Sequence, residues 1–297
     1  MNQIFTGTGV ALVTPFHKHG TIDFNALKSL LDHVIKGKVD FLVVMGTTGE
    51  SVTLSRDEKR ALVDFVIEEN ENRLPLMLGV GGNNTQEIEN TLKSFDLSGI
   101  SGILSVSPYY NKPQQKGIYQ HFKAIAAASP LPVILYNVPG RTHSNMSAAT
   151  TLQLASDFRN IIGVKEASGN LVQVMEILRD RPKGFLVLSG DDVLTLPMIA
   201  MGAEGVISVV ANSHPAAFSK MVQMGREGKM DEAKKIHFRL MEYIDLLFQD
   251  GSPSGIKAAL DIMGICENNL RLPLVKVNKA LNNQLRQAME LLNETYP

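Results

Sequence analysis

The chain has 297 residues, of which 44% are hydrophobic and 20% are charged, and its formal net charge is −1. This composition is typical of a globular protein with a large core, and the lack of a basic tract argues against nucleic acid as the main partner. The single cysteine, Cys266, excludes an internal disulfide framework and a CxxC site, which favours a reducing cytoplasm.

The first five residues, MNQIF, do not form the basic and then apolar regions of a secretory signal peptide. No run of about 18 apolar residues occurs that would span a membrane. We therefore expect a cytoplasmic protein that has neither a membrane nor a nucleic acid as its partner.

Eight short apolar runs, rich in β-branched residues, recur at a spacing that fits one strand and one helix each time. They occupy residues 9–14, 41–45, 76–80, 102–106, 132–136, 161–165, 185–189 and 206–210. Near-continuous apolar runs of this kind are what a parallel sheet buried on both faces requires.

The segments between these runs are amphipathic. Residues 24–35 place apolar side chains at helical spacing, Ser55 to Glu58 match the pattern of a capping box, and Thr85 is expected to begin another helix. Eight such alternations predict an α/β fold, a (β/α)8 TIM barrel. The alternative, a doubly wound open sheet, usually places a phosphate-binding glycine motif after its first strand, where this chain has residues 14–17, TPFH.

The barrel should be complete near Ala211, and helical patterns continue beyond it. Ser213-His214-Pro215 is a favourable helix start. We expect a catalytic barrel over residues 1–225 and a C-terminal helical domain over 226–297. Two apolar stripes there are expected to pack on the chain's own barrel, with an oligomer contact as the alternative: Ile236, Leu240, Ile244 and Leu247, and Leu281, Leu285, Met289 and Leu292.

Lys165 ends the sixth apolar run, and the turn residues Ser168, Gly169 and Asn170 follow shortly after it. Burial of an ammonium group is costly, so a lysine held in apolar surroundings lowers its pKa and becomes an amine nucleophile. The alternative is an edge lysine that reaches into water, paired with Glu166. In a barrel of this kind, reactions take place where the strands end.

Other chemically useful side chains follow the remaining strands. Thr47 and Thr48 lie in a loop suited to holding a carboxylate, with a plain capped turn as the alternative. Tyr136 ends the fifth run beside Lys165, and Arg141 follows on the next loop. Together with Tyr110, these groups suit attack of Lys165 on a 2-oxo acid, with the hydroxyl groups relaying protons.

Four segments carry a specific resemblance to a known family. They are GTTGE at residues 46–50, PYYNKP at 108–113, YNVPGRT at 136–142 and GVKE at 163–166. With these motifs in family order, residues 6–275 resemble the 4-hydroxy-tetrahydrodipicolinate synthase (dihydrodipicolinate synthase) family, of the pyruvate-dependent class I aldolases and lyases.

The resemblance implies a lyase that condenses pyruvate with L-aspartate 4-semialdehyde, the first committed step of diaminopimelate and lysine biosynthesis. Lys165 would form the Schiff base, so that no cofactor is needed, and Tyr136 would transfer protons. Thr48 and Tyr110 would complete a hydroxyl relay. The family is usually a homotetramer, a dimer of dimers, in which the neighbouring subunit contributes Tyr110.

The resemblance also implies the substrate contacts. Thr47 and Thr48 would hold the pyruvate carboxylate, Arg141 would bind the carboxylate of the aldehyde, and Gly190 and Ile207 would offer backbone groups near the lysine. Sialic acid lyases and sugar-acid aldolases are the alternatives within the superfamily. The lyases typically carry Ser-Thr in the first motif and lack the arginine.

This sequence departs from the family pattern in two places. Residues 251–254, GSPS, have only one of two usual prolines; we expect a change of loop shape that touches no chemical group of the site. The candidate allosteric lysine site would consist of Ser51, Asn83, Glu87 and Tyr109. In lysine-sensitive members a small residue stands at the position of Val52, and two histidines stand at the positions of Arg56 and Lys59. The cationic side chains of Arg56 and Lys59 would repel the lysine ammonium group, so we expect weak or absent inhibition by L-lysine.

Two further motifs and a second functional class have to be considered. The pair Asp191-Asp192 is interpreted as a helix N-cap with a solvated neighbour rather than as metal ligands, and no metal is expected. His17 and His19 are expected on a surface loop. A non-catalytic small-molecule sensor on the same barrel is the alternative from another functional class.

Overall fold

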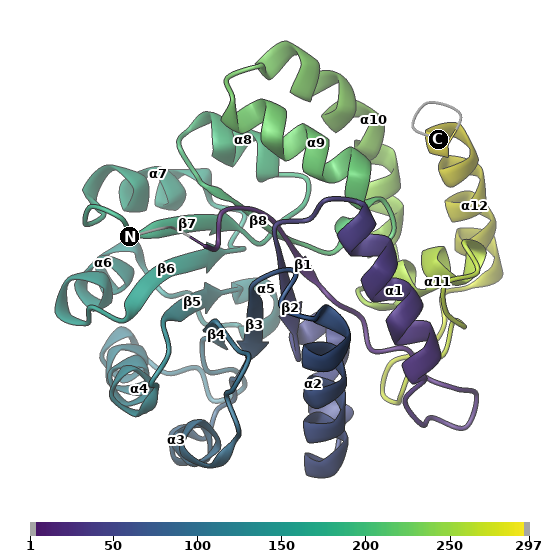
Figure 1. Ribbon diagram of the computed structural model, residues 1–297. Helices are drawn as coiled ribbons and strands as arrows, with labels where there is room; N and C mark the ends of the chain where they lie inside the picture. The colour runs from purple at the N-terminus through teal and green to yellow at the C-terminus, as the bar shows by residue number, and fades with distance from the viewer. Residues whose placement is uncertain (1–3, 294–297) are drawn as a thin grey trace.

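The computed structural model describes residues 4–293, and within them eight parallel strands close into a barrel in the order β1 to β8 (Figure 1). The strands are β1 (Gly7–Ala11), β2 (Phe41–Val44), β3 (Leu76–Gly79), β4 (Gly102–Val106), β5 (Val133–Asn137), β6 (Ile161–Glu166), β7 (Leu186–Ser189) and β8 (Gly205–Ser208). The predicted barrel is confirmed, and the closed ring excludes the doubly wound open sheet.

Helices surround the strands and alternate with them along the chain (Figure 1). The capping box at Ser55 is present, since its hydroxyl accepts the Glu58 N–H while the Glu58 carboxylate accepts the Ser55 N–H. The helices of the ring are α1 (Phe24–Lys36), α2 (Arg56–Asn70), α3 (Thr85–Ser94), α4 (Gln115–Ala128), α5 (Pro139–Thr142), α6 (Ala148–Asp157), α7 (Leu171–Asp180) and α8 (Thr195–Ala200).

Side chains along the strands alternate between two apolar layers, as the two-residue period of a strand requires. On β5, Val133 and Leu135 pack outward with the helices, whereas Ile134 and Tyr136 join the cluster that fills the barrel interior. Phe5 belongs to the same interior cluster. The interior is therefore a packed core, and polar groups lie at the ends of the strands.

Two strands differ by two or more residues at one end or both from the apolar runs that predicted them. β1 covers residues 7–11 rather than 9–14, and β8 covers 205–208 rather than 206–210. After β8 the chain turns into a 3-10 helix, η3 (Val210–Asn212). The Asn212 side chain accepts the Val13 N–H and donates to the Ala11 carbonyl, so side-chain hydrogen bonds continue the contact between β1 and the segment after β8 beyond their parallel ladder.

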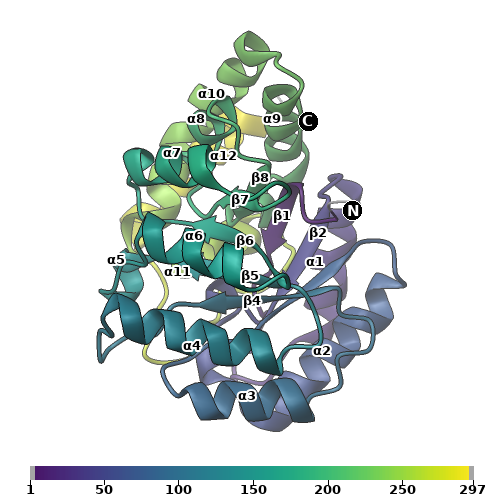
Figure 2. The ribbon, with the colours of Figure 1, turned by 90° about the vertical axis from the view of Figure 1, so that its left-hand side faces the viewer.

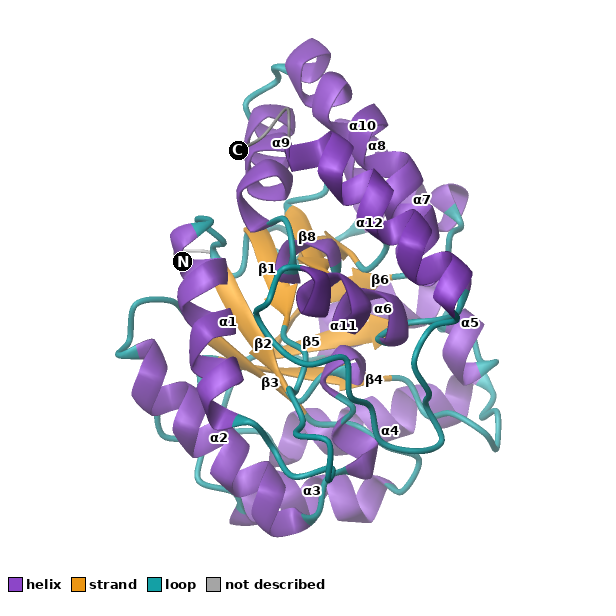
Figure 3. Ribbon diagram, turned by 90° about the vertical axis from the view of Figure 1, so that its right-hand side faces the viewer, coloured by secondary structure: helices purple, strands orange, loops and turns teal. Residues whose placement is uncertain are grey.

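The C-terminal helices are α9 (Pro215–Arg226), α10 (Met230–Gln249), α11 (Ser254–Ile262) and α12 (Lys279–Asn293). In Figure 2, α9, α10 and α12 form the upper part of the molecule, and Figure 3 shows α11 in front of the strands. Both predicted apolar stripes are buried in the chain's own core, as expected. The proposed domain boundary at residue 225 falls in the last turn of α9 and stays a prediction.

The described helices include none that is long and apolar enough to cross a membrane. The signal-peptide expectation concerned residues 1–5, of which residues 1–3 lie outside the described part of the chain.

Candidate active site

Lys165 lies near the carboxyl end of β6, with only 6% of its surface exposed. It is the register partner of Tyr136 on β5, and its Nζ lies 4.3 Å from the centroid of the Tyr136 ring. The alternative of an edge lysine in water is therefore wrong. Glu166 does not pair with it, because the Glu166 carboxylate accepts hydrogen bonds from Asn137 and Gln173 instead.

Burial lowers the pKa of Lys165 from 10.5 to about 8. The negative charge of Asp192 opposes this shift, and the positive charge of Arg141 adds to it. A buried amine with such a pKa is neutral in a useful fraction of molecules near neutral pH, as a nucleophile toward a carbonyl must be.

Gly190, at the end of β7, makes room for the lysine side chain. A Cβ atom at this position would lie 2.9 Å from Cε of Lys165 and 2.7 Å from Cβ of Ala167. Any residue larger than glycine at position 190 would therefore push against the Lys165 side chain. Ile207 on β8 is buried in the interior cluster below the mouth.

The interpretation of the aspartate pair is wrong for Asp192. This side chain is buried, and its carboxylate accepts hydrogen bonds from the Ser208 hydroxyl and from the N–H groups of Val209 and Val210. The following helix, α8, has Leu194 at its N-cap. Burial raises the pKa of Asp192 to about 6, while these hydrogen bonds lower it. Asp192 therefore joins the ends of β7 and β8 beside the lysine.

Tyr136 presents its phenol in the same buried environment. Burial raises its pKa to about 12, whereas the charge of Arg141 and a hydrogen bond with the Thr47 side chain lower it. Thr47 belongs to the 3-10 helix η1 (Thr47–Gly49), in which Thr48 is buried and Thr47 is exposed. Of the two threonines, Thr47 is the one whose side chain lowers the pKa of the phenol.

Arg141 lies on the short helix α5, which begins with a proline at its first position, where the missing N–H is tolerated. The side chain is exposed, and Nη2 donates to the Ser252 carbonyl at 3.4 Å. The expectation that residues 251–254 touch no group of the site is therefore wrong. The same C-terminal segment helps to hold the arginine at the mouth.

Tyr110 is the most exposed of the large hydrophobic residues in the described part of the chain, at 87%, and its φ of +73° is unusual for a residue other than glycine. It follows β4, whereas Lys165 and Tyr136 are buried within the barrel mouth. Tyr109 beside it is only partly exposed.

The residues of the candidate lysine site follow three neighbouring strands, β2, β3 and β4, and lie in loops or at the start of a helix. Ser51 is in the 3-10 helix η2 (Ser51–Thr53) after β2, and Val52 beside it is 80% exposed. Asn83 and Glu87 are exposed at the start of α3, after β3. Arg56 and Lys59 lie in the first turns of α2. The predicted grouping of these side chains stays a prediction.

Sequence reasoning missed a buried ion pair at the mouth. Glu50, directly after η1, pairs with Lys257 of α11, and the side chains of both are 0% exposed. Their separation of 207 positions hides the contact from any local pattern. The one signal of this pair in the sequence was Lys257, a lysine among the apolar residues of α11.

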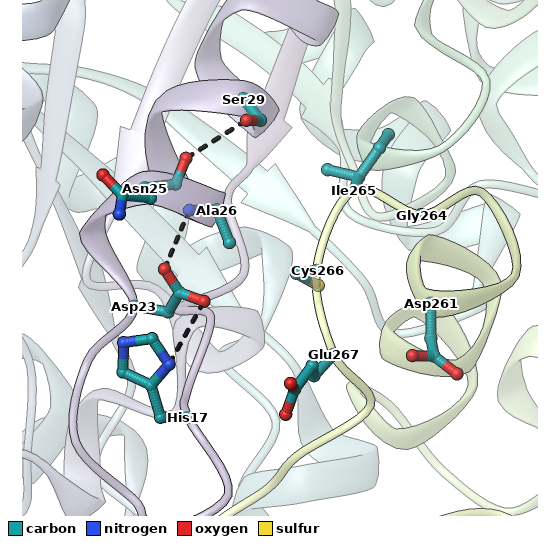
Figure 4. Close-up of a pocket in the computed structure, with 10 residues that line it drawn as sticks. All are labelled: His17, Asp23, Asn25, Ala26, Ser29, Asp261, Gly264, Ile265, Cys266 and Glu267. Atoms are coloured by element: carbon teal, nitrogen blue, oxygen red, sulfur yellow. Dashed lines mark hydrogen bonds and ion pairs between the residues drawn. The ribbon is translucent and has the colours of Figure 1, made fainter.

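A hollow of about 410 Å³ lies away from these residues, between the start of α1 and the segment after α11 (Figure 4). His17 lines it and contacts Asp23 at 3.4 Å. His17 and His19 are both exposed, which confirms the surface loop. Within residues 4–293, no three His, Cys, Asp or Glu side chains are gathered so as to hold a metal ion.

The model of the Dihydrodipicolinate synthetase family matches residues 4–292 of this chain. A 4-hydroxy-tetrahydrodipicolinate synthase of Flavobacterium psychrophilum is 56% identical over 283 residues, which cover 95% of this chain and 97% of that protein. The solved dihydrodipicolinate synthase of Thermotoga maritima has a TM-score of 0.95 at 35% identity, covering 98% and 99% of the two chains. A monomeric dihydrodipicolinate synthase variant has a TM-score of 0.94 at 36% identity, covering 97% and 96%.

Proposed function

The chain belongs to the dihydrodipicolinate synthetase family, and from that premise we propose how the residues at the barrel mouth share the reaction. Its function is the condensation of pyruvate with L-aspartate 4-semialdehyde to 4-hydroxy-tetrahydrodipicolinate, in lysine and diaminopimelate biosynthesis. The observation that carries the proposal is the buried Lys165 amine, held against the Tyr136 ring with a lowered pKa.

Lys165 Nζ attacks the C2 carbonyl carbon of pyruvate, and loss of one water leaves an imine on the lysine. Loss of a proton from the methyl group then gives an enamine, whose carbon attacks the aldehyde carbon of the second substrate. The amino group of that substrate next attacks C2, closes the ring and releases Lys165 as a free amine. The lysine is restored at each turnover, and no separate cofactor enters.

Tyr136 moves the protons that these steps require. Its phenol lies beside the Lys165 amine and has the Thr47 side chain as a hydrogen-bond partner. This contact supports Thr47 as the first member of the hydroxyl relay, a place that the sequence resemblance gave to Thr48. Thr47 and Thr48 would also hold the pyruvate carboxylate through the turn that they form.

The second substrate enters past Arg141, which is exposed at the mouth and supplies the positive charge that its carboxylate requires. Backbone groups of Gly190 and Ile207 complete the surroundings of the imine. Arg141 favours a short carboxylated aldehyde over the neutral chain of a sugar acid.

Tyr110 is proposed to act across a subunit interface, in a homotetramer built as a dimer of dimers. Its exposure and its left-handed backbone suit a residue whose partner lies in another subunit. One similar protein is a monomeric variant, so the tetramer is proposed from Tyr110 and not from likeness. The catalytic barrel is assigned to residues 1–225 and the helical domain to 226–297, in a protein of the cytoplasm.

The direct test is turnover of pyruvate with L-aspartate 4-semialdehyde, with Lys165→Ala as the control. We expect pyruvate loss that disappears in the variant. A folded wild-type protein that consumes no pyruvate with this aldehyde but cleaves sialic acid would contradict the role of Arg141. Equal turnover in Lys165→Ala would contradict the imine.

A further inference from the structure

Glu50 joins the loop after β2 to the C-terminal helical segment. Lys257 Nζ donates to one oxygen of its carboxylate, and the Arg271 N–H donates to the other at 3.0 Å. The same ammonium group also donates to the Asn269 carbonyl at 2.8 Å. Both oxygens of a fully buried carboxylate are thus held by residues from beyond the barrel.

Glu50 also fixes the shape of its own loop. Its backbone is left-handed, with φ 51° and ψ 33°, between η1 and η2, a conformation that residues other than glycine seldom adopt. The Glu50 carbonyl accepts the Thr53 hydroxyl, and the neighbouring Gly49 carbonyl accepts the Thr14 hydroxyl at 2.7 Å. Thr47, the partner of the Tyr136 phenol, opens this same loop three residues earlier.

The stability of the fold does not by itself require such a pair. Desolvation of two buried charges offsets much of their attraction, and a well-packed apolar pair often serves a fold as well. Here Lys257 lies over the Phe16 ring at 4.1 Å and the Arg271 guanidinium over the same ring at 4.5 Å. Two cations and two carboxylates are therefore gathered behind the loop that carries the threonines, because Lys257 pairs with Glu50 and the Arg271 guanidinium pairs with Glu58.

We propose that Glu50 is a positioning residue for the condensation: held by Lys257 and by the Arg271 backbone, it keeps the loop in the one arrangement that places the Thr47 hydroxyl at the Tyr136 phenol. The inference rests on the proposed function, because it requires that Thr47 and Tyr136 relay protons. Glu50 itself touches no reacting atom.

The test is a double-mutant cycle on kcat, made with Glu50→Gln in the wild-type protein and in Thr47→Val. A misplaced relay should cost about tenfold or more in the wild-type background, with a smaller change in KM for pyruvate. In Thr47→Val there is no hydroxyl left to misplace, so Glu50→Gln should change kcat by less than about twofold. An equal loss in both backgrounds would overturn the proposal.

Glu204→Gln is the matched control for lost stability. Its carboxylate likewise accepts from a cation, Arg181, and from a backbone N–H, that of Val187, but it lies before β8 at the other end of the strands. This variant should lower Tm and leave kcat within about twofold, as expected for a residue that acts on stability alone. A kcat loss equal to that of Glu50→Gln would overturn the proposal.

Glu50→Gln leaves the Lys257 ammonium buried without its partner, so the double variant Glu50→Gln/Lys257→Met is made as well. It should recover Tm, because no unpaired buried charge remains, while kcat stays low because the loop is no longer held. Recovery of kcat together with Tm would show that the Glu50–Lys257 pair contributes to stability only, and would overturn the proposal. Full kcat in Thr47→Val would instead overturn the relay of the proposed function, and this inference with it.

Discussion

Lys165 illustrates how burial prepares a side chain for chemistry. With a pKa of 10.5, about one molecule in three thousand would carry a neutral lysine at pH 7, whereas with a pKa of about 8 the fraction is about one in ten. The apolar run before it and the turn after it made this position recognisable in the sequence. The direction of the pKa shift followed from burial, as desolvation of an ammonium group requires.

The pH dependence of kcat/KM for pyruvate should report this pKa. Only the neutral amine attacks, so kcat/KM should rise about tenfold for each pH unit below about 7 and level off above about 8. Initial rates measured between pH 5.5 and about 9.5 under saturating aldehyde test this expectation. A profile that still rises steeply toward 10.5, as for an ordinary lysine, would contradict it.

Asp192→Asn should move this acid limb to lower pH. The Asp192 charge raises the pKa of Lys165, so its removal lets the pKa fall further and leaves more neutral amine at a given pH. The variant should also lose about 1–3 kcal/mol of stability, because the amide cannot accept all the hydrogen bonds from Ser208, Val209 and Val210.

Kinetic pH profiles of the wild-type protein and the Asp192→Asn variant, with thermal unfolding as the stability measure, test this pair of effects. An acid limb that moves to higher pH would be the contrary result. Asp192 is also a residue that the sequence could not place, because an aspartate in a loop looks the same whether solvated or buried.

At the scale of elements, the strand ends were predictable and the turns after them were not. Each apolar run located a strand to within a few residues, and the barrel rule then placed Lys165, Tyr136 and Arg141 at one mouth. Which threonine meets Tyr136 depends on the direction that each side chain takes in η1. Adjacent residues with the same hydroxyl group give no signal for that choice.

Helix α2 carries a prediction about regulation. Arg56 and Lys59 occupy the positions where lysine-sensitive relatives are expected to have histidines, and their charges would repel the ammonium groups of L-lysine. We expect weak or absent inhibition by L-lysine in the wild-type protein. The double variant Arg56→His/Lys59→His should become more sensitive at pH 8, where the new histidines are mostly neutral.

Inhibition constants for L-lysine in both proteins, at fixed pyruvate, check this prediction. Glu87→Gln in the double variant serves as the control, since it removes a carboxylate proposed to receive the ligand. A sub-millimolar inhibition constant for the unmodified protein would contradict the repulsion.

At the scale of the whole molecule, the C-terminal helices contribute to the mouth of the barrel. Ser252 contacts Arg141, and Lys257 pairs with Glu50. The sequence predicted these helices and their buried stripes, because helical periodicity is local. It could not predict their contacts with the mouth, which join positions more than a hundred residues apart.

Subunit complementation tests whether Tyr110 acts across an interface. Tyr110→Phe and Lys165→Ala should each be nearly inactive alone. Mixed oligomers should regain activity, because a Lys165→Ala subunit supplies Tyr110 to a neighbour that retains its lysine. Proteins mixed after dissociation and reassembly are compared with the two variants left unmixed. No gain on mixing, with mixed oligomers demonstrated by mass spectrometry, would place Tyr110 outside the shared relay.

Borohydride reduction in the presence of pyruvate, followed by peptide mass spectrometry, tests whether Lys165 forms an imine with pyruvate. We expect one reduced pyruvyl adduct, on the peptide that contains Lys165, and its loss in Lys165→Ala. Lys257→Met should keep the adduct, because that lysine takes no part in the covalent step. An active protein that gives no adduct, or one whose adduct lies on another lysine, would show that Lys165 does not form the imine.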